Sequence, residues 1–93
     1  MIPPGATAIV GAAESTEIGK VPDMSSVGLA IDAAANAMQD AGITAADIDG
    51  FTCGYFPVAD MSRQLGIFPS WADNTVVGGC SWMFQLRNAR AAI

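Results

Sequence analysis

The feature that most constrains the fold of this chain is a β-branched run that meets two glycines, a cysteine and then an apolar segment. The stretch runs Asn74-Thr75-Val76-Val77-Gly78-Gly79-Cys80-Ser81-Trp82. It predicts a buried strand over residues 75–78 that turns sharply into a helix, because apolar residues recur downstream at helical spacing. At such a turn Cys80 lies at the helix N-terminus, where unpaired N–H groups and the helix dipole favour a thiolate. Tight packing at the turn is the alternative role of this cysteine.

Upstream, the sequence alternates between strand and helix signals. Residues 6–13 are an apolar run with β-branched members and predict a buried strand of a parallel sheet. The polar residues 14–24 predict a loop. Ser25 or Ser26 can then cap a helix whose apolar residues share one face and which ends at Gly42. Thr44-Ala45-Ala46-Asp47 resembles a capping box and predicts a single helical turn.

The remaining segments are shorter. Residues 51–54 predict a second strand, and Asp60 is predicted to cap a short helix over residues 61–65. Residues 67–73 predict a loop. The order is strand, helix, strand, short helix, strand, helix, without any hairpin signal. This order predicts the α/β class, as a parallel β-α-β-(α)-β-α layer with right-handed crossovers.

The composition is unusual for an independent domain. Charged residues make up 14% of the chain and apolar residues 52%, whereas about 25% of a typical domain is charged. So few charges leave much of the large surface of a small domain apolar. We therefore expect residues 1–93 to be a partial domain whose apolar faces meet other protein, in a longer chain, a homo-oligomer or a complex with a partner subunit.

Charge and hydropathy exclude several classes of partner. The net charge is −5 with four basic residues, which disfavours nucleic acid and anionic membrane surfaces as partners. No uninterrupted apolar run approaches the roughly 20 residues that span a bilayer. Two distant cysteines do not make a disulfide framework. These features predict a cytoplasmic protein with reduced thiols and no membrane span.

Three stretches carry a family resemblance. They are Ala8-Ile9-Val10-Gly11-Ala12-Ala13-Glu14-Ser15, then Ala33 to Asp40 followed by Ala41-Gly42-Ile43 and Ala46-Asp47-Ile48-Asp49-Gly50, and finally Gly78-Gly79-Cys80-Ser81. Together they resemble the N-terminal portion of the thiolase superfamily, in the branch of the sterol-carrier thiolases and lipid-transfer-like acetyl-CoA acetyltransferases. Members of that family have two similar halves in a five-layered αβαβα fold and form dimers or tetramers. The resemblance implies that this chain is the start of such a fold and is incomplete on its own.

The resemblance also implies a chemical role for Cys80. It lies where thiolases keep the cysteine that accepts an acyl group from an acyl-CoA, which implies a coenzyme A thioester as substrate, no permanently bound cofactor and no metal. The chain contains no histidine, the commonest general base near neutral pH. In thiolases the histidines and a second cysteine come from later in the chain. We therefore expect these 93 residues alone to be inactive, although the full-length parent would be an acyltransferase.

Other interpretations stay open. Trp82 and Met83 are bulky where the family has small residues, and Val77 replaces the usual asparagine, which allows a retro-aldolase-type lyase or a structural partner subunit with the same fold. Cys53 is expected to be a packing residue. A dinucleotide-binding turn at residues 11–16 is the weakest alternative, because alanine and threonine occupy two of the three glycine positions of that fingerprint. Three aromatic residues are expected at an interface or in core packing, with an acyl pocket as the alternative: Tyr55, Phe68 and Trp71. Three arginines are expected at the surface, with CoA phosphates as alternative partners: Arg63, Arg87 and Arg90.

Overall fold

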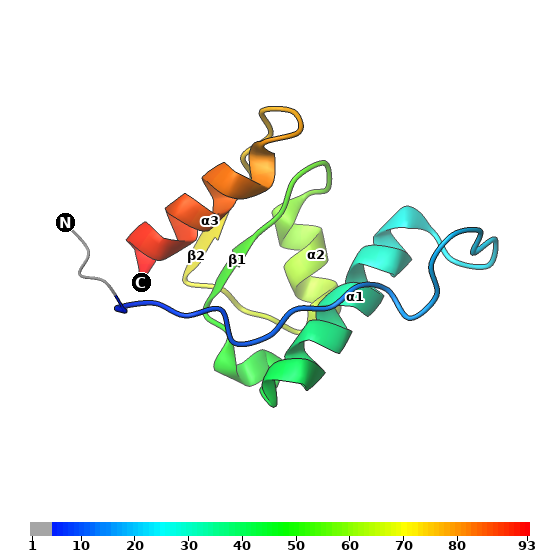
Figure 1. Cartoon of the computed structure of the whole chain (residues 1–93), viewed down its shortest axis with the longest axis horizontal. Helices are drawn as coiled ribbons and strands as arrows, with labels where there is room; N and C mark the ends of the chain where they lie inside the picture. Colours follow the sequence, from blue (N-terminus) through cyan, green and yellow to red (C-terminus); the bar gives the residue numbers. More distant parts are fainter. Residues whose placement is uncertain (1–4) are drawn as a thin grey trace.

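The computed structural model describes residues 5–93, in which helices alternate with short strands (Figure 1). In chain order the elements are α1 (Ser26–Ala41), the 3-10 turn η1 (Ala45–Asp47), β1 (Gly50–Thr52), α2 (Val58–Leu65), β2 (Trp71–Asp73) and α3 (Ser81–Ala92). The two strands lie between α3 on one side and α1 with α2 on the other. The chain therefore has a mixed helix and strand architecture of the α/β kind. Residues 1–4 of the predicted domain lie outside the described part.

The first helix and the turn after it form where the sequence predicts them. The Ser25 hydroxyl accepts a hydrogen bond from the Gly28 amide at 3.0 Å and caps α1. Gly42 ends α1 with a φ of 72°, in the left-handed region that glycine adopts at little cost. In η1 the Thr44 amide donates to the Asp47 carboxylate at 2.9 Å, which completes the predicted capping box.

The sheet consists of two parallel strands joined through α2. β1 pairs with β2 in the register Gly50 to Trp71, Phe51 to Ala72 and Thr52 to Asp73. The parallel pairing agrees with the predicted α/β class, but the bounds differ. The second predicted strand, residues 51–54, begins one residue earlier and ends at Thr52. The helix predicted over residues 61–65 begins at Val58, because Pro57, and not Asp60, is its N-cap residue.

The third predicted strand, residues 75–78, is wrong. The partner of β1 is Trp71–Asp73, within the segment predicted to be a loop. Gly50 allows this pairing to be close, since a Cβ there would lie 3.2 Å from Cε3 of Trp71. Backbone groups of residues 75–78 are instead used by side chains of α3: Gln85 Nε2 donates to the Thr75 carbonyl at 3.0 Å, and the Val77 amide donates to the Ser81 hydroxyl at 2.8 Å. Those bonds compete with sheet pairing.

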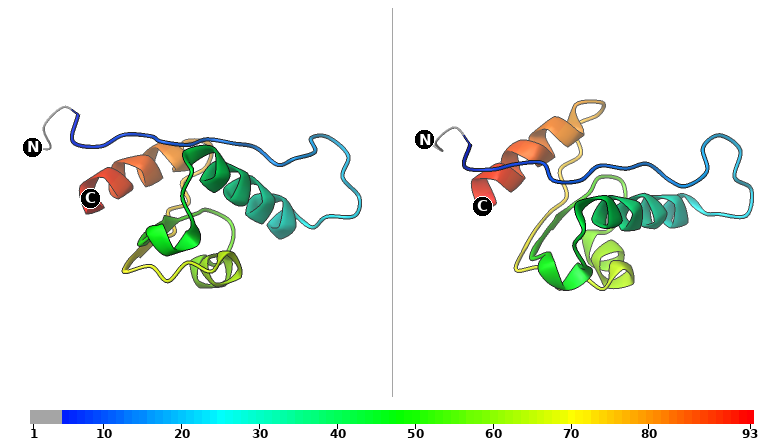
Figure 2. Two further views of the ribbon diagram at one scale, coloured as in Figure 1. Left: turned by 90° about the horizontal axis from the view of Figure 1, so that it is seen from below. Right: turned by 60° about the horizontal axis from the view of Figure 1, so that its bottom comes forward.

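The first predicted strand, residues 6–13, is also wrong, because this segment is extended but belongs to no sheet. We call residues 6–16 the strap. Figure 2 shows the strap crossing the molecule past both α3 and α1. At Gly11 the strap lies close against α1, since a Cβ there would lie 2.6 Å from the Ala37 carbonyl oxygen and 2.8 Å from the Ala41 Cβ. Only glycine fits at this point of the strap without displacing the backbone of α1.

A ladder of polar contacts fixes the strap to α1. The Ala12 amide donates to Asp40 at 3.0 Å, Asn36 donates to the Glu14 carbonyl at 3.1 Å, and the Thr16 amide donates to Asp32 at 2.6 Å. The contacts recur every second strap residue and every fourth helix residue. Two extended residues advance about 6.6 Å and four helical residues about 6.0 Å, so the two repeats match. The polar face of α1 therefore holds backbone of the strap.

Very little of the apolar side-chain surface is fully buried. Within residues 5–93 the buried apolar side chains are Met61, at 4% exposure, and Ile67, at 3%. The chain exposes 6503 Å², whereas a folded protein of 9.5 kDa is expected to expose about 5,000 Å². Large apolar side chains that remain exposed include Ile9, Val10, Ile18, Phe68, Trp82, Met83, Leu86 and Ile93. The surface therefore exceeds that of a compact domain by about 1,500 Å².

Candidate functional site

Cys80 lies where the sequence analysis places it, at the start of α3. It is the N-cap residue of this helix, and its exposed side chain makes no capping hydrogen bond. Its Sγ contacts the Val77 carbonyl oxygen at 3.6 Å. Figure 1 shows the turn before α3, in orange, projecting beyond the end of the helix. The thiol is therefore open to reagents in solvent.

Ser81, the residue after the cysteine, holds the turn together. Its side chain is buried, at 6% exposure, and its hydroxyl donates to the Gly78 carbonyl at 2.6 Å while accepting from the Val77 amide at 2.8 Å. The Ser81 amide also donates to the Gly78 carbonyl at 3.1 Å. Gly78 has a φ of 81°, which favours glycine at this position of the turn. Ser81 therefore fixes the shape of the turn that precedes α3.

The second cysteine has a different environment. Cys53 is half-buried just after β1, and its Sγ donates to the Phe56 carbonyl oxygen at 3.3 Å. Burial raises the pKa of the Cys53 thiol above its ordinary value of 9.0. A buried thiol with a raised pKa is mostly protonated at neutral pH, and the thiolate is the nucleophilic form. The environment of Cys53 therefore suits packing better than reaction.

A polar cluster that the sequence analysis missed joins the carboxyl end of the sheet to α3. The Asp73 carboxylate, at the end of β2, accepts from the Thr75 hydroxyl at 2.7 Å and from the Asn88 side-chain amide at 3.1 Å. These bonds, Thr75 first and then Asn88, lower the pKa of Asp73 below its ordinary value of 3.8. Thr52 is half-buried beside them, and its hydroxyl oxygen, which is shielded from solvent, has no partner within hydrogen-bond length in residues 5–93.

This cluster lies at the start of the loop that leads from β2 to the Cys80 turn. Asn88 Nδ2 also contacts the Thr75 hydroxyl at 3.3 Å, so strand end, loop and helix share one set of bonds. Asp73 and Asn88 are fifteen positions apart in sequence. Asn88 lies in a segment that the sequence analysis identifies as a helix by its apolar residues. The available sequence signal is the polar pair Gln85 and Asn88, three positions apart on one side of α3.

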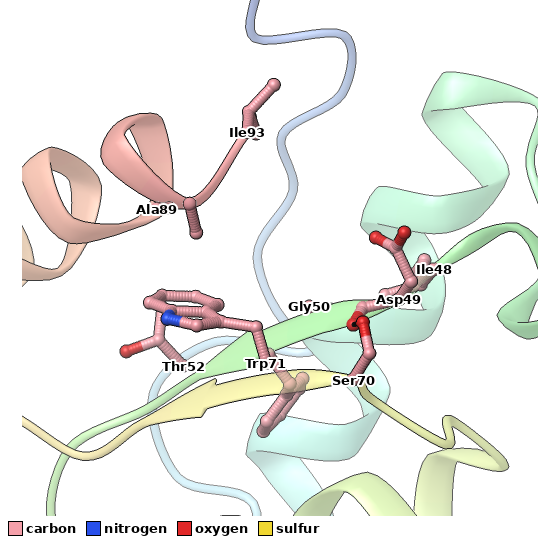
Figure 3. A pocket seen from close by; sticks show the side chains of 10 residues that line it. Ile48, Asp49, Gly50, Thr52, Ser70, Trp71, Ala89 and Ile93 are labelled. Atoms are coloured by element: carbon pink, nitrogen blue, oxygen red, sulfur yellow. Dashed lines mark hydrogen bonds between the residues drawn. The ribbon is translucent and has the colours of Figure 1, made fainter.

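A pocket of about 410 Å³ opens between the sheet and the C-terminal part of α3. Figure 3 shows the Trp71 indole on the α3 side of the sheet, below Ala89, with Asp49 and Ser70 at the rim. The residues that line it are Ile48, Asp49, Gly50, Phe51, Thr52, Ser70, Trp71, Ala89, Ala92 and Ile93. Of the aromatic candidates, Trp71 lines this pocket and Tyr55 is 73% exposed. Phe68, which is 87% exposed, lines a separate hollow beside α2 together with Arg63. Cys80 is not among the lining residues, so the structure does not bring the thiol and this pocket together.

No group of three or more histidine, cysteine or carboxylate side chains in residues 5–93 is arranged to hold a metal ion. None of the helices in this part of the chain has the length and apolar character needed to cross a membrane. Neither a scan against protein-family models nor a search of curated proteins finds a match to the chain.

Proposed function

We propose that this chain supplies the acyl-accepting cysteine of a thiolase-like acyltransferase, with Cys80 as the nucleophile. The observation that supports the proposal is the exposed Cys80 thiol at the first turn of α3, free of any capping bond. The Ser81 and Met83 amides donate to carbonyls of the turn. Among residues 5–93 the intervening Trp82 amide has no backbone acceptor, and it is available to an oxygen bound beside the thiol.

The proposed reaction is acyl transfer from a coenzyme A thioester. The Cys80 thiolate attacks the thioester carbonyl carbon, a new carbon–sulfur bond forms, and the CoA thiolate leaves with the electron pair of the bond that breaks. The acyl group then remains on Cys80 until a second acceptor removes it. Because the chain contains no histidine, other residues would have to supply the base for turnover. We expect this chain alone to accept an acyl group slowly and not to turn over.

The test is an adduct on one of two cysteines. Wild type, Cys80→Ser and Cys53→Ser are incubated with acetyl-CoA, and the intact mass of each protein is measured over time. We expect one acetyl group on wild type and on the Cys53→Ser control, and none on Cys80→Ser. Acetylation that persists in Cys80→Ser, or a wild-type protein that stays unmodified while an exposed-thiol reagent labels it fully, would contradict the proposal.

The neighbours of Cys80 favour a second candidate, a non-thiolytic protein with the same fold. Trp82 and Met83 are 62% and 57% exposed, so two bulky side chains follow the thiol at the surface. Such side chains restrict the approach of a large thioester and suit contact with another subunit. In this candidate the chain belongs to a retro-aldolase-type lyase or a structural partner subunit. The same mass measurement separates the candidates, because only acyl transfer predicts the acetyl group on Cys80.

A further inference from the structure

Helix α3 turns polar side chains toward the sheet and leaves its large apolar side chains exposed to solvent. Its polar residues Gln85 and Asn88 are half-buried and donate to the Thr75 carbonyl at 3.0 Å and to Asp73 at 3.1 Å. Its large apolar residues are exposed: Trp82, Met83 and Leu86 at 62%, 57% and 50%. A helix on the surface of a globular protein normally turns its apolar side toward the core. The outer side of α3 therefore has the character of a buried surface.

Part of this outer side forms one wall of a groove. Met83, Leu86, Arg87 and Arg90 follow one another along α3 at spacings of one to three residues and share a side of the helix. The opposite wall is formed by strap residues 7–9, and the groove has a volume of about 610 Å³. Figure 2 shows the strap passing alongside α3 in both views. The groove is concave and follows the axis of a helix, which is the shape that an amphipathic helix fills in helix-in-groove recognition.

The charges at the groove select the kind of helix. The basic residue Arg87 lines it, and none of its lining residues has an acidic side chain. A second copy of the chain that presented its own α3 would bring two further arginines and no carboxylate, because α3 contains no acidic residue. Like charges placed together oppose association. The groove thus disfavours pairing of α3 with itself and favours an acidic partner.

We propose that this groove binds an amphipathic helix of a partner, with its apolar stripe against Met83, Leu86 and Ile9 and carboxylates flanking that stripe. The chain as a whole exposes about 1,500 Å² more than a compact protein of its mass, and exposed apolar residues of both α3 and the strap contribute to this excess; a standard interface takes about 800 Å² from each partner. The apolar contacts supply most of the affinity, while Arg87 supplies selectivity for the acidic flank. This surface is separate from Cys80 chemistry and does not depend on the proposed acyl transfer.

The experiment uses three synthetic helical peptides, each labelled with a fluorophore. The first has leucines at helical spacing flanked by glutamates, the second has the same stripe flanked by lysines, and the third keeps the glutamates but has glutamines in the stripe. Binding to the whole chain is measured by fluorescence anisotropy at two salt concentrations. The variants are Arg87→Glu, Leu86→Gln and the matched control Arg63→Glu, which makes the same charge change on α2, away from this groove. Circular dichroism checks that every variant folds.

We expect the glutamate-flanked peptide to bind at least about 3-fold tighter than the lysine-flanked one, with the difference shrinking in high salt. Arg87→Glu should weaken that binding roughly 3- to 10-fold and Arg63→Glu should not. Leu86→Gln should weaken it by about 10-fold, since it removes apolar contact. The proposal would be overturned if the two flanked peptides bound equally well, or if the two arginine variants had equal effects. It would also be overturned if the chain formed a dimer that Leu86→Gln disrupts. Binding of phosphatidylglycerol vesicles, but not of the peptides, that depends on Leu86 would overturn it as well.

Discussion

The contact between Gly11 and α1 gives the sharpest test of how the strap is held. A methyl group at position 11 would lie 2.6 Å from the Ala37 carbonyl oxygen, 2.8 Å from the Ala41 Cβ and 3.0 Å from the Ala41 amide nitrogen. Two of these atoms belong to the helix backbone and cannot rotate away. Gly11→Ala therefore forces the strap to move outward, and overpacking of this kind costs about 1–3 kcal/mol.

The cost has an upper limit, because the strap can leave α1 altogether. Its side-chain ladder to Asp32, Asn36 and Asp40 consists of five exposed hydrogen bonds. At the low end of their usual contribution, as exposure suggests, five such bonds total about 2–3 kcal/mol. Gly11→Ala should therefore lower the free energy of unfolding by about 1–3 kcal/mol, and a larger strain would release the strap and leave the rest folded.

The assay combines urea denaturation with hydrogen exchange. Gly79→Ala is the matched control, since a Cβ at position 79 meets no atom within 4 Å and its φ lies outside the left-handed region. It should change stability by no more than about 0.5 kcal/mol. In Gly11→Ala the amides of Ala12 and Thr16 should exchange about tenfold faster for each 1.4 kcal/mol lost. Equal urea midpoints for the two variants, together with unchanged exchange at Ala12, would refute the close packing of the strap.

Three further outcomes follow from the site and the core. The hydrogen bonds to the Asp73 carboxylate lower its pKa, so they stabilise the fold above the ordinary pKa of 3.8 and are lost as pH falls through the lowered pKa. The stability advantage of wild type over Asp73→Asn should therefore be full near neutral pH and shrink in acid. A stability difference that does not change with pH would exclude the carboxylate as its source. Iodoacetamide should alkylate exposed Cys80 well before half-buried Cys53, as peptide mapping would show, and the reverse order would contradict the placement of both thiols. Met61→Ala should cost about 2–5 kcal/mol in urea unfolding and the exposed Met83→Ala less than about 0.5, whereas equal losses would mean that α2 does not form the core.

Local signals predicted the helices better than the strands. Ser25 and Gly42 delimit α1 through bonds within a few residues, so the sequence around each end contains the whole cause. Residues 75–78 have a stronger strand composition than Trp71–Asp73, but side chains of α3 take up their backbone groups. The competing side chains come from another element of the fold, so the sequence of residues 75–78 itself contains no pattern that indicates them. The strap fails as a predicted strand for a related reason, since the Asp32, Asn36 and Asp40 ladder holds it on a helix.

The candidate site divides in the same way. The position of Cys80 at a helix start follows from two glycines before it and helical spacing after it, and the structure has it there. The bonds among Asp73, Thr75 and Asn88 join the end of β2, the loop after it and α3, and only the folded topology brings them together. The apolar excess in the composition predicts exposed apolar surface, as α3 shows. Which side of α3 faces outward depended on hydrogen bonds that its apolar stripe does not indicate.

The hydroxyl of Ser81 has a practical consequence for position 80. Because Ser81 joins the Val77 amide to the Gly78 carbonyl, the turn keeps its shape without help from the neighbouring side chain. Position 80 should therefore accept very different side chains, from alanine to a large aromatic residue, with little change in folding. A fluorophore, spin label or affinity tag attached to Cys80 would accordingly report on the molecule without disturbing it. Attachment chemistry aimed at this one thiol offers a route to immobilise the chain in a single orientation, with the strap and the groove of α3 left open to solvent.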